Sequence, residues 1–244
     1  MARHKINYYI SLQDLELKKM YADSVKYPIA VKEKSSFSIP SYRKNKIRNL
    51  KGCLPQNAFI RIYNGSPELW VNIKYSGYRK AFKKFLRQYY SVRILPSFYH
   101  VDHSLARCIA RQNHLQYVRL FLIPSYFNIR QGSLVEKKMK KLIKGRDVYT
   151  ADMYTYFKLF RIVFPKNIDI FYRDFRDIVN EFRKHTNESS TDVAGSLYIM
   201  LRLWNEYFCD EEYFTKRRVL NIMKKIRYAM MEEYPNFTER YAYL

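Results

Sequence analysis

One short segment of the chain combines the residue types that acid–base and metal chemistry use. The segment FYHVDHSLARCIA covers residues 98–110, and it places two of the five histidines, His100 and His103, around Asp102. A carboxylate binds hard divalent cations through its oxygens, and a neutral imidazole accepts a proton near neutral pH. The Asp102–His103 pair is therefore a candidate catalytic site, although an Asp-His dipeptide is also common as ordinary surface.

The elements around this pair are expected to form a ββα unit. Residues 92–103 are rich in strand-forming side chains and end at the pair, and residues 117–124 form a short apolar run typical of a second strand. A helix capped by Ser125 is expected next, with Asn128 near its start. Such a unit can bring the end of its first strand beside the first turn of its helix, so that Asp102 and Asn128 offer oxygen ligands to one cation.

This layout predicts the hydrolysis of a phosphodiester bond. Oxygen ligands favour Mg²⁺ or another hard divalent metal. His103 can take a proton from an attacking water, while the metal neutralises the phosphate and stabilises the leaving oxygen. We therefore assign His103, Asp102 and Asn128 as catalytic residues, with Asp102 and Asn128 as the metal ligands.

The same residues resemble a known family. The string VDH at residues 101–103, followed by YVRLFLIPSYFNIRQGSLVEKKMKKL at residues 117–142, resembles the HNH, or ββα-metal, endonucleases. It is similar in particular to the HNH domain of CRISPR effector nucleases, over about residues 96–144. The resemblance implies a metal-dependent endonuclease that cuts DNA in preference to RNA. It also fits toxin effectors and mobile-element nucleases, which would imply an acidic immunity or regulatory protein as partner.

The chain departs from the family pattern in three places, one of which is the absence of the prolines that follow the catalytic His in the family. The CxxC pairs that staple many HNH proteins with zinc are absent, and the middle Asn or His of the family has only weak counterparts. Asn113 and His114 are the candidates for that position, but they precede the second strand by several residues. His100 is left open as a ligand, a supporting group or a packed core histidine.

Further residues are candidates for supporting the site or for binding nucleic acid. A zinc site from His100, His103, Cys108 and His114 is conceivable but follows no standard spacing. Glu136 either lines the site or pairs with a lysine on its own helix. Basic side chains around the unit can contact phosphate, or can simply be solvated surface. These candidates for nucleic-acid binding are Arg107, Arg111, Arg130, Lys137, Lys138 and Lys141.

The overall charge points to an anionic partner. The chain has 45 Lys and Arg against 22 Asp and Glu, a net charge of +23, and 17% of its residues are aromatic. Such an excess attracts nucleic acid first, and aromatic rings can stack on bases. The alternative function is therefore a strongly basic, non-catalytic nucleic-acid-binding protein. A membrane-surface protein that uses lysine-rich helices is a weaker third alternative.

The expected fold class is α+β, with a small ββα-metal core and a predominantly helical C-terminal part. We divide the chain into a basic N-terminal segment (1–66), an HNH-like nuclease core (67–146) and a helical C-terminal region (147–244). Residues 35–49 are expected to be a loop or arm, residues 58–66 and 68–75 a hairpin, and residues 76–90 an amphipathic helix capped by Ser76.

The cysteine content, the N-terminus and the apolar runs of the sequence bear on where in the cell the protein resides. Three well-separated cysteines and no CxxC suit a reducing compartment, and we expect a cytoplasmic protein. The N-terminus has no apolar region typical of a cleaved signal peptide, so secretion would need another route. No apolar run approaches the length of a transmembrane span.

Overall fold

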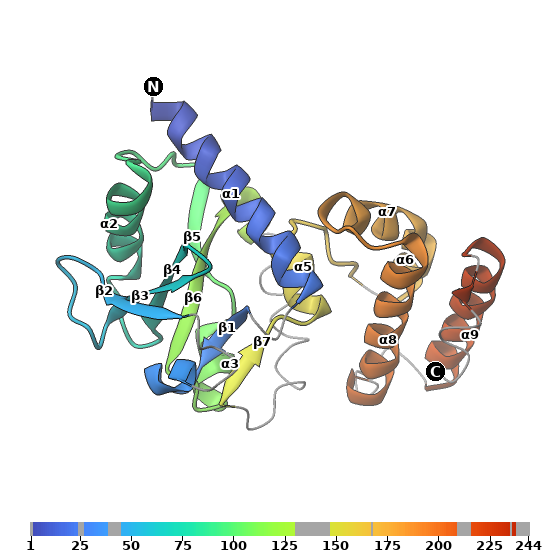
Figure 1. The fold of residues 1–244 in the computed structure, drawn as a ribbon. Helices are drawn as coiled ribbons and strands as arrows, with labels where there is room; N and C mark the ends of the chain where they lie inside the picture. The colour runs from blue at the N-terminus through green and yellow to red at the C-terminus, as the bar shows by residue number, and fades with distance from the viewer. Residues whose placement is uncertain are drawn as a thin grey trace.

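The computed structural model describes residues 2–23, 27–38, 45–129, 147–166, 168–208, 216–234 and 236–237. Within them the fold is α+β, as predicted: some helices lie beside a curled antiparallel sheet, and the last four gather to one side of it (Figure 1). The strands are β1 (Pro28–Val31), β2 (Lys46–Asn49), β3 (Ala58–Tyr63), β4 (Ser66–Asn72), β5 (Tyr99–His103), β6 (Tyr117–Pro124) and β7 (Val148–Thr150). The helices are α1 (Ala2–Ala22), η2 (Lys34–Ser38, a 3-10 turn), α2 (Tyr78–Tyr90), α3 (Arg107–Gln112), α5 (Met153–Leu159), α6 (Ile168–Arg173), α7 (Phe175–His185), α8 (Ser190–Phe208) and α9 (Lys216–Glu233).

Strand β6 lies at the centre of the sheet. The strand order is β2-β3-β4-β6-β1-β7, and β5 pairs with the second half of β6. The first half of β6 pairs with β4 on one edge and with β1 on the other, and all these pairings are antiparallel. Because β6 is buried along almost its whole length, its apolar sequence reads as a continuous run rather than an alternation.

The predicted hairpin and the amphipathic helix are both confirmed. β3 and β4 pair through a tight turn at Asn64 and Gly65, where both residues have positive φ angles. Helix α2 buries Phe82 and Phe85 against the sheet and leaves its cationic side chains exposed. The predicted cap at Ser76 is wrong, because the residue before the helix is Gly77 and no side chain caps the first turn.

The N-terminal helix α1 was not predicted, and it closes an open edge of the sheet. β4 stops pairing with β6 at Arg119, so the backbone of Leu122 has no strand beside it on that edge. The side chain of Gln13 fills this place: its Nε2 donates to the Leu122 carbonyl at 3.0 Å, and its Oε1 accepts from the Leu122 N–H at 2.9 Å. A buried amide thus substitutes for a missing strand.

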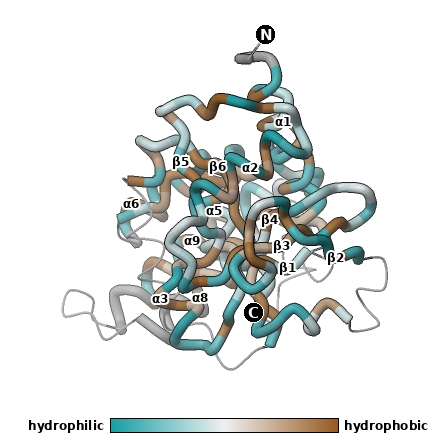
Figure 2. The backbone as a smooth tube through the Cα atoms, turned by 90° about the vertical axis from the view of Figure 1, so that its left-hand side faces the viewer, coloured by the Kyte–Doolittle hydropathy of each residue, from teal (hydrophilic) through white to brown (hydrophobic). Residues whose placement is uncertain are grey.

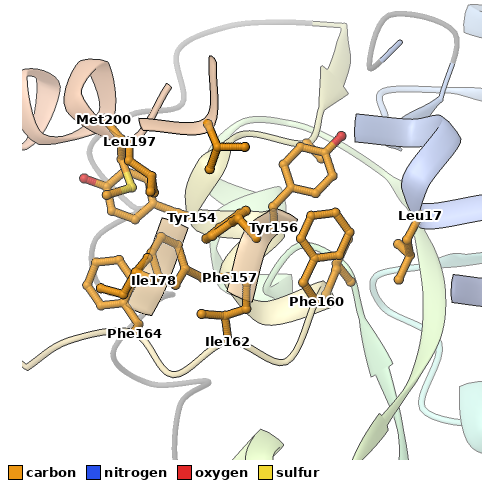
Figure 3. Packing of buried hydrophobic residues seen from close by; sticks show 14 of the residues in the cluster. Leu17, Tyr154, Tyr156, Phe157, Phe160, Ile162, Phe164, Ile178, Leu197 and Met200 are labelled. Atoms are coloured by element: carbon orange, nitrogen blue, oxygen red, sulfur yellow. The ribbon is translucent and has the colours of Figure 1, made fainter. Parts of the chain in front are cut away.

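The C-terminal part is helical, as predicted, in all described elements after β7. Aromatic residues of α5 form its core, with Phe157 packed edge-on against Phe182 of α7 at 4.8 Å between ring centroids. Figure 3 shows Tyr154, Phe157 and Phe160 in one layer, with Leu17 of α1 at its side. The buried aromatic residues of α5 therefore connect α1, which covers the sheet edge, to α7 and α8.

The N-terminal region contains more regular structure than expected. Residues 35–49, predicted to be a loop or arm, include the end of η2 and the whole of β2, which pairs with β3. Strands from all three predicted segments join one sheet: β1, β4 and β7 come from the first, second and third segments respectively. The segment boundaries themselves stay a prediction.

None of the described helices is long and apolar enough to cross a membrane. Hydrophobic and hydrophilic residues alternate along the chain instead of gathering in one long run (Figure 2).

Candidate functional site

Strand β5 directs Asp102 and His103 to opposite faces, because successive side chains of a strand alternate. The His103 ring packs on Tyr78 of α2, with 4.5 Å between ring centroids. The Asp102 carboxylate contacts Lys158 of α5 instead, with 2.7 Å between Oδ2 and Nζ. The two neighbouring residues therefore lie in two different environments.

Asp102 is held in an ion pair with a buried lysine. The Lys158 side chain is only 2% exposed, and its Nζ also donates to the carbonyl oxygen of His103 at 3.0 Å. Burial acts to raise the pKa of Asp102, but the Lys158 ammonium, together with His103, holds that pKa below its usual value. Asp102 is therefore ionised at neutral pH, with its cation supplied by the chain.

His103 is a neutral, buried imidazole. Its residue is 5% exposed, and among the described residues no group forms a hydrogen bond with its Nε2. Burial lowers the pKa of His103 to about 4, and the nearby charges of Arg107, Lys158 and Arg79 act in the same direction against the opposing effect of Asp102. The ring is therefore neutral near pH 7, chiefly because it is buried.

Two guanidinium groups flank the Tyr78 ring beside His103. The Cζ atom of Arg79 lies 5.5 Å from the ring centroid and that of Arg107 lies 5.8 Å from it. Arg79 begins the exposed side of α2, and Arg107 opens α3; both are exposed. We call His103, Tyr78, Arg79 and Arg107 the Tyr78 cluster. Its exposed basic continuation along α2 consists of Lys80, Lys83, Lys84 and Arg87.

Asn128 lies beside His100. The Asn128 Nδ2 and the His100 Nδ1 are 3.5 Å apart, and both residues are half-buried. By strand alternation His100 shares a face with Asp102, so the predicted ligands Asp102 and Asn128 lie on one side of β5. A divalent cation at Asp102 would have to displace the Lys158 ammonium. The Mg²⁺ site at Asp102 and Asn128 stays a prediction.

The other predicted residues have separate roles or lie elsewhere. Asn113 ends α3, where its Nδ2 donates to the Ile109 carbonyl at 2.9 Å, and His114 is exposed in the following turn. Arg111 is exposed on α3. Across the part of the chain that the structure describes, no three His, Cys, Asp or Glu side chains form a group that could hold a metal ion. Outside the described residues lie Arg130, Glu136, Lys137, Lys138 and Lys141.

The sequence did not predict the residues that surround Asp102 and His103. Tyr78 and Arg79 fall within the amphipathic helix predicted for residues 76–90, but no local pattern links them to His103. Lys158 stands within the aromatic run YTYFKLF, where a buried lysine without a nearby acid in the sequence indicates a distant carboxylate partner.

Comparison of the chain with protein-family models, with curated proteins and with solved structures finds no match.

Proposed function

We propose that the protein binds nucleic acid at the Tyr78 cluster and hydrolyses its phosphodiester bonds, with His103 as the general base. The observation that carries this proposal is a neutral imidazole whose buried Nε2 has no hydrogen-bond partner among the described residues, set against a tyrosine that two arginines flank. A guanidinium binds phosphate oxygens through paired N–H groups, so Arg79 and Arg107 are suited to hold the phosphate.

The bound phosphate would itself raise the pKa of His103. Arg79 and Arg107 contribute to the low pKa of His103, and a phosphate between them would offset their charge. His103 would then accept a proton from water, whose oxygen forms a bond to phosphorus as the bond to the leaving oxygen breaks. Lys158 would hold Asp102 and the His103 backbone in place throughout. No step in this proposal uses a metal.

The substrate and setting follow from the family resemblance. DNA is the proposed substrate in preference to RNA, and a toxin effector or mobile-element nuclease with an acidic partner protein is the proposed context. The charge of +23 supports a polyanionic substrate of either kind.

The test is cleavage of plasmid DNA and of RNA by the full chain, with Mg²⁺ and with EDTA. We expect wild type to cut, and His103→Asn to bind as tightly but to cut at least about 100-fold more slowly, because general-base catalysis contributes about that much. His185→Asn, at the end of α7, is the matched control and should cut normally. Equal cutting by wild type and His103→Asn would refute the role of His103, and cutting only with Mg²⁺ would restore the metal prediction.

The second candidate is a nucleic-acid-binding protein without catalysis. It is favoured by the burial of His103, whose 5% exposure keeps solvent water away from Nε2. In this case wild type and His103→Asn both shift the nucleic acid on a gel and neither cuts it.

A further inference from the structure

A cavity of about 300 Å³ lies beside the centre of the sheet, across β6 from His103. It opens where the pairing of β4 with β6 has ended, and α1 and the end of α2 cover it. Polar and apolar surface contribute about equally to its walls, and the apolar part includes Tyr9, Leu69, Phe85, Tyr90, Leu120 and Phe121. Its volume is at the lower end of the range for pockets that bind a small molecule.

A network of buried charges borders the cavity. Arg119 Nη2 contacts Glu16 Oε2 at 2.6 Å, and Arg119 Nη1 contacts Glu68 Oε1 at 3.2 Å. Glu68 also accepts from Arg61 at 3.0 Å and from the Trp70 indole at 3.1 Å. Among the described residues, Glu68 accepts from several donors, whereas Glu16 shares the Arg119 cation with it.

Glu16 leaves one oxygen without a partner at this cavity. Its Oε1 is buried, and no described group donates a hydrogen bond to it. When Glu16 and Glu68 are both ionised, neither can donate to the other, so Oε1 needs a donor from elsewhere. Burial raises the pKa of Glu16 to about 7, and nearby Glu68 adds to this rise against the attraction of Arg119. Near neutral pH the Glu16 carboxyl therefore binds a proton part of the time. A ligand that donates a hydrogen bond to Oε1 can take the place of that proton.

We propose that this cavity binds an amino-bearing nucleobase, whose amino group donates to Glu16 Oε1. A flat heteroaromatic ring fits walls made of Tyr9, Phe85 and Phe121, because aromatic rings pack favourably face to edge and face to face. The exposed Lys19 at the rim can contact the attached phosphate. The base belongs either to a free nucleotide or to a nucleotide within a strand. This inference stands apart from the proposed hydrolysis, because it uses no residue of the Tyr78 cluster.

The test compares two ligands on the wild-type chain by calorimetry. Adenosine 5′-monophosphate carries the amino group, and purine riboside 5′-monophosphate lacks it. We expect the first to bind about tenfold or more tightly, as for a hydrogen bond to a charged group. We also expect proton release on binding at pH 6.5, detected as a dependence of the measured heat on the buffer. Arg119 of β6, Glu68 of β4, Lys19 and Tyr9 of α1, and Tyr90 of α2 are the charged or titratable groups around Glu16.

Two variants separate the site from general effects. Glu16→Gln should lose the proton release and most of the preference between the ligands, whereas Asp14→Asn removes a carboxylate of α1 outside the cavity and should keep both. Leu12→Trp should abolish binding by filling the cavity without touching the charges. Binding only of an adenine-containing oligonucleotide, with the same response to Glu16→Gln, would assign the base to a strand. Equal affinity for the two monophosphates, or no binding of any adenine ligand, would overturn the proposal.

Discussion

Two clusters of buried charge lie on either side of β6, and they hold their carboxyl groups in opposite states. In the first, Glu16 and Glu68 share Arg119, and burial raises the pKa of Glu16 to about 7. In the second, Asp102 pairs with the Lys158 ammonium, and its pKa is lowered despite burial. The number of cations available to each carboxylate, and not burial alone, decides whether it keeps its proton.

The largest expected effect comes from removing the shared cation of the first cluster. Arg119→Met leaves Glu16 without a counter-ion and Glu68 with Arg61 alone, so we expect the free energy of unfolding to fall by about 4 kcal/mol at pH 7. Urea denaturation measures the loss. Arg176→Met breaks the exposed pair with Glu233 and should cost less than about 1 kcal/mol. A loss for Arg119→Met as small as that of the control would contradict a buried network.

Removing the cation of the second cluster should have a somewhat smaller effect. Lys158→Met leaves only one carboxylate uncompensated, and Asp102 is 19% exposed, so we expect a loss of about 3 kcal/mol. The double variant Lys158→Met with Asp102→Asn should recover part of this loss, because it removes the stranded charge. Denaturation of both single variants and the double variant completes the cycle. The ion pair is not the source of the loss if the double variant is as unstable as Lys158→Met.

Glu16 of the first cluster and His103, next to Asp102 in the chain, should titrate with opposite effects on stability. His103 has a lowered pKa, so its contribution is complete above pH 6.5 and is lost as the pH falls towards 4. Glu16 has a raised pKa, so its contribution is complete below pH 4.5 and is lost as the pH rises through about 7. Each contribution amounts to at most about 3 kcal/mol, and the two slopes oppose each other where the windows overlap.

Single variants should separate these slopes. Between pH 4.5 and 6.5, stability should rise with pH more steeply in Glu16→Gln than in wild type, and it should fall with pH in His103→Gln. Thermal or urea unfolding at a series of pH values provides the measurement. Identical pH profiles for the two variants would mean that neither group titrates as its surroundings indicate.

Exposed charge gives the smallest effect on stability and serves as the reference for the buried clusters. Lys83→Gln on α2 should change the free energy of unfolding by less than about 0.5 kcal/mol. It should still reduce the slope of log affinity against log salt concentration by about 0.9 if it neutralises one DNA phosphate. Lys225→Gln, on the exposed side of α9, should leave that slope unchanged. The same slope for both variants would exclude Lys83 from the binding surface.

The sequence predicted the parts of the fold whose patterns are local. The hairpin of β3 and β4, the strands β5 and β6, and the amphipathic α2 all have periodic apolar positions or turn residues. α1 was missed because its inward-facing side includes Gln13 and Glu16, which interrupt the apolar stripe. β2 was missed because all four of its residues are exposed and three of them are polar.

The candidate site was only partly predictable, because only its local part, the residues of β5, follows from a sequence pattern. The spacing of Asp102, His103 and Asn128 was read as one constellation, but strand alternation turns the adjacent pair to opposite faces. Lys158 and Tyr78 reach Asp102 and His103 from distant points of the chain, and such partners follow from tertiary packing rather than from any short motif.

The amide of Gln13 has a consequence for how the molecule avoids self-association. An unpaired N–H and C=O on a buried strand edge form a template on which another chain can add a strand. Gln13 occupies both groups of Leu122 with one side chain, and α1 lies over the place where an incoming strand would sit. Loss of that single amide would leave the N–H and C=O of Leu122 without this partner at the strand edge, so α1 alone would keep an incoming strand away from them.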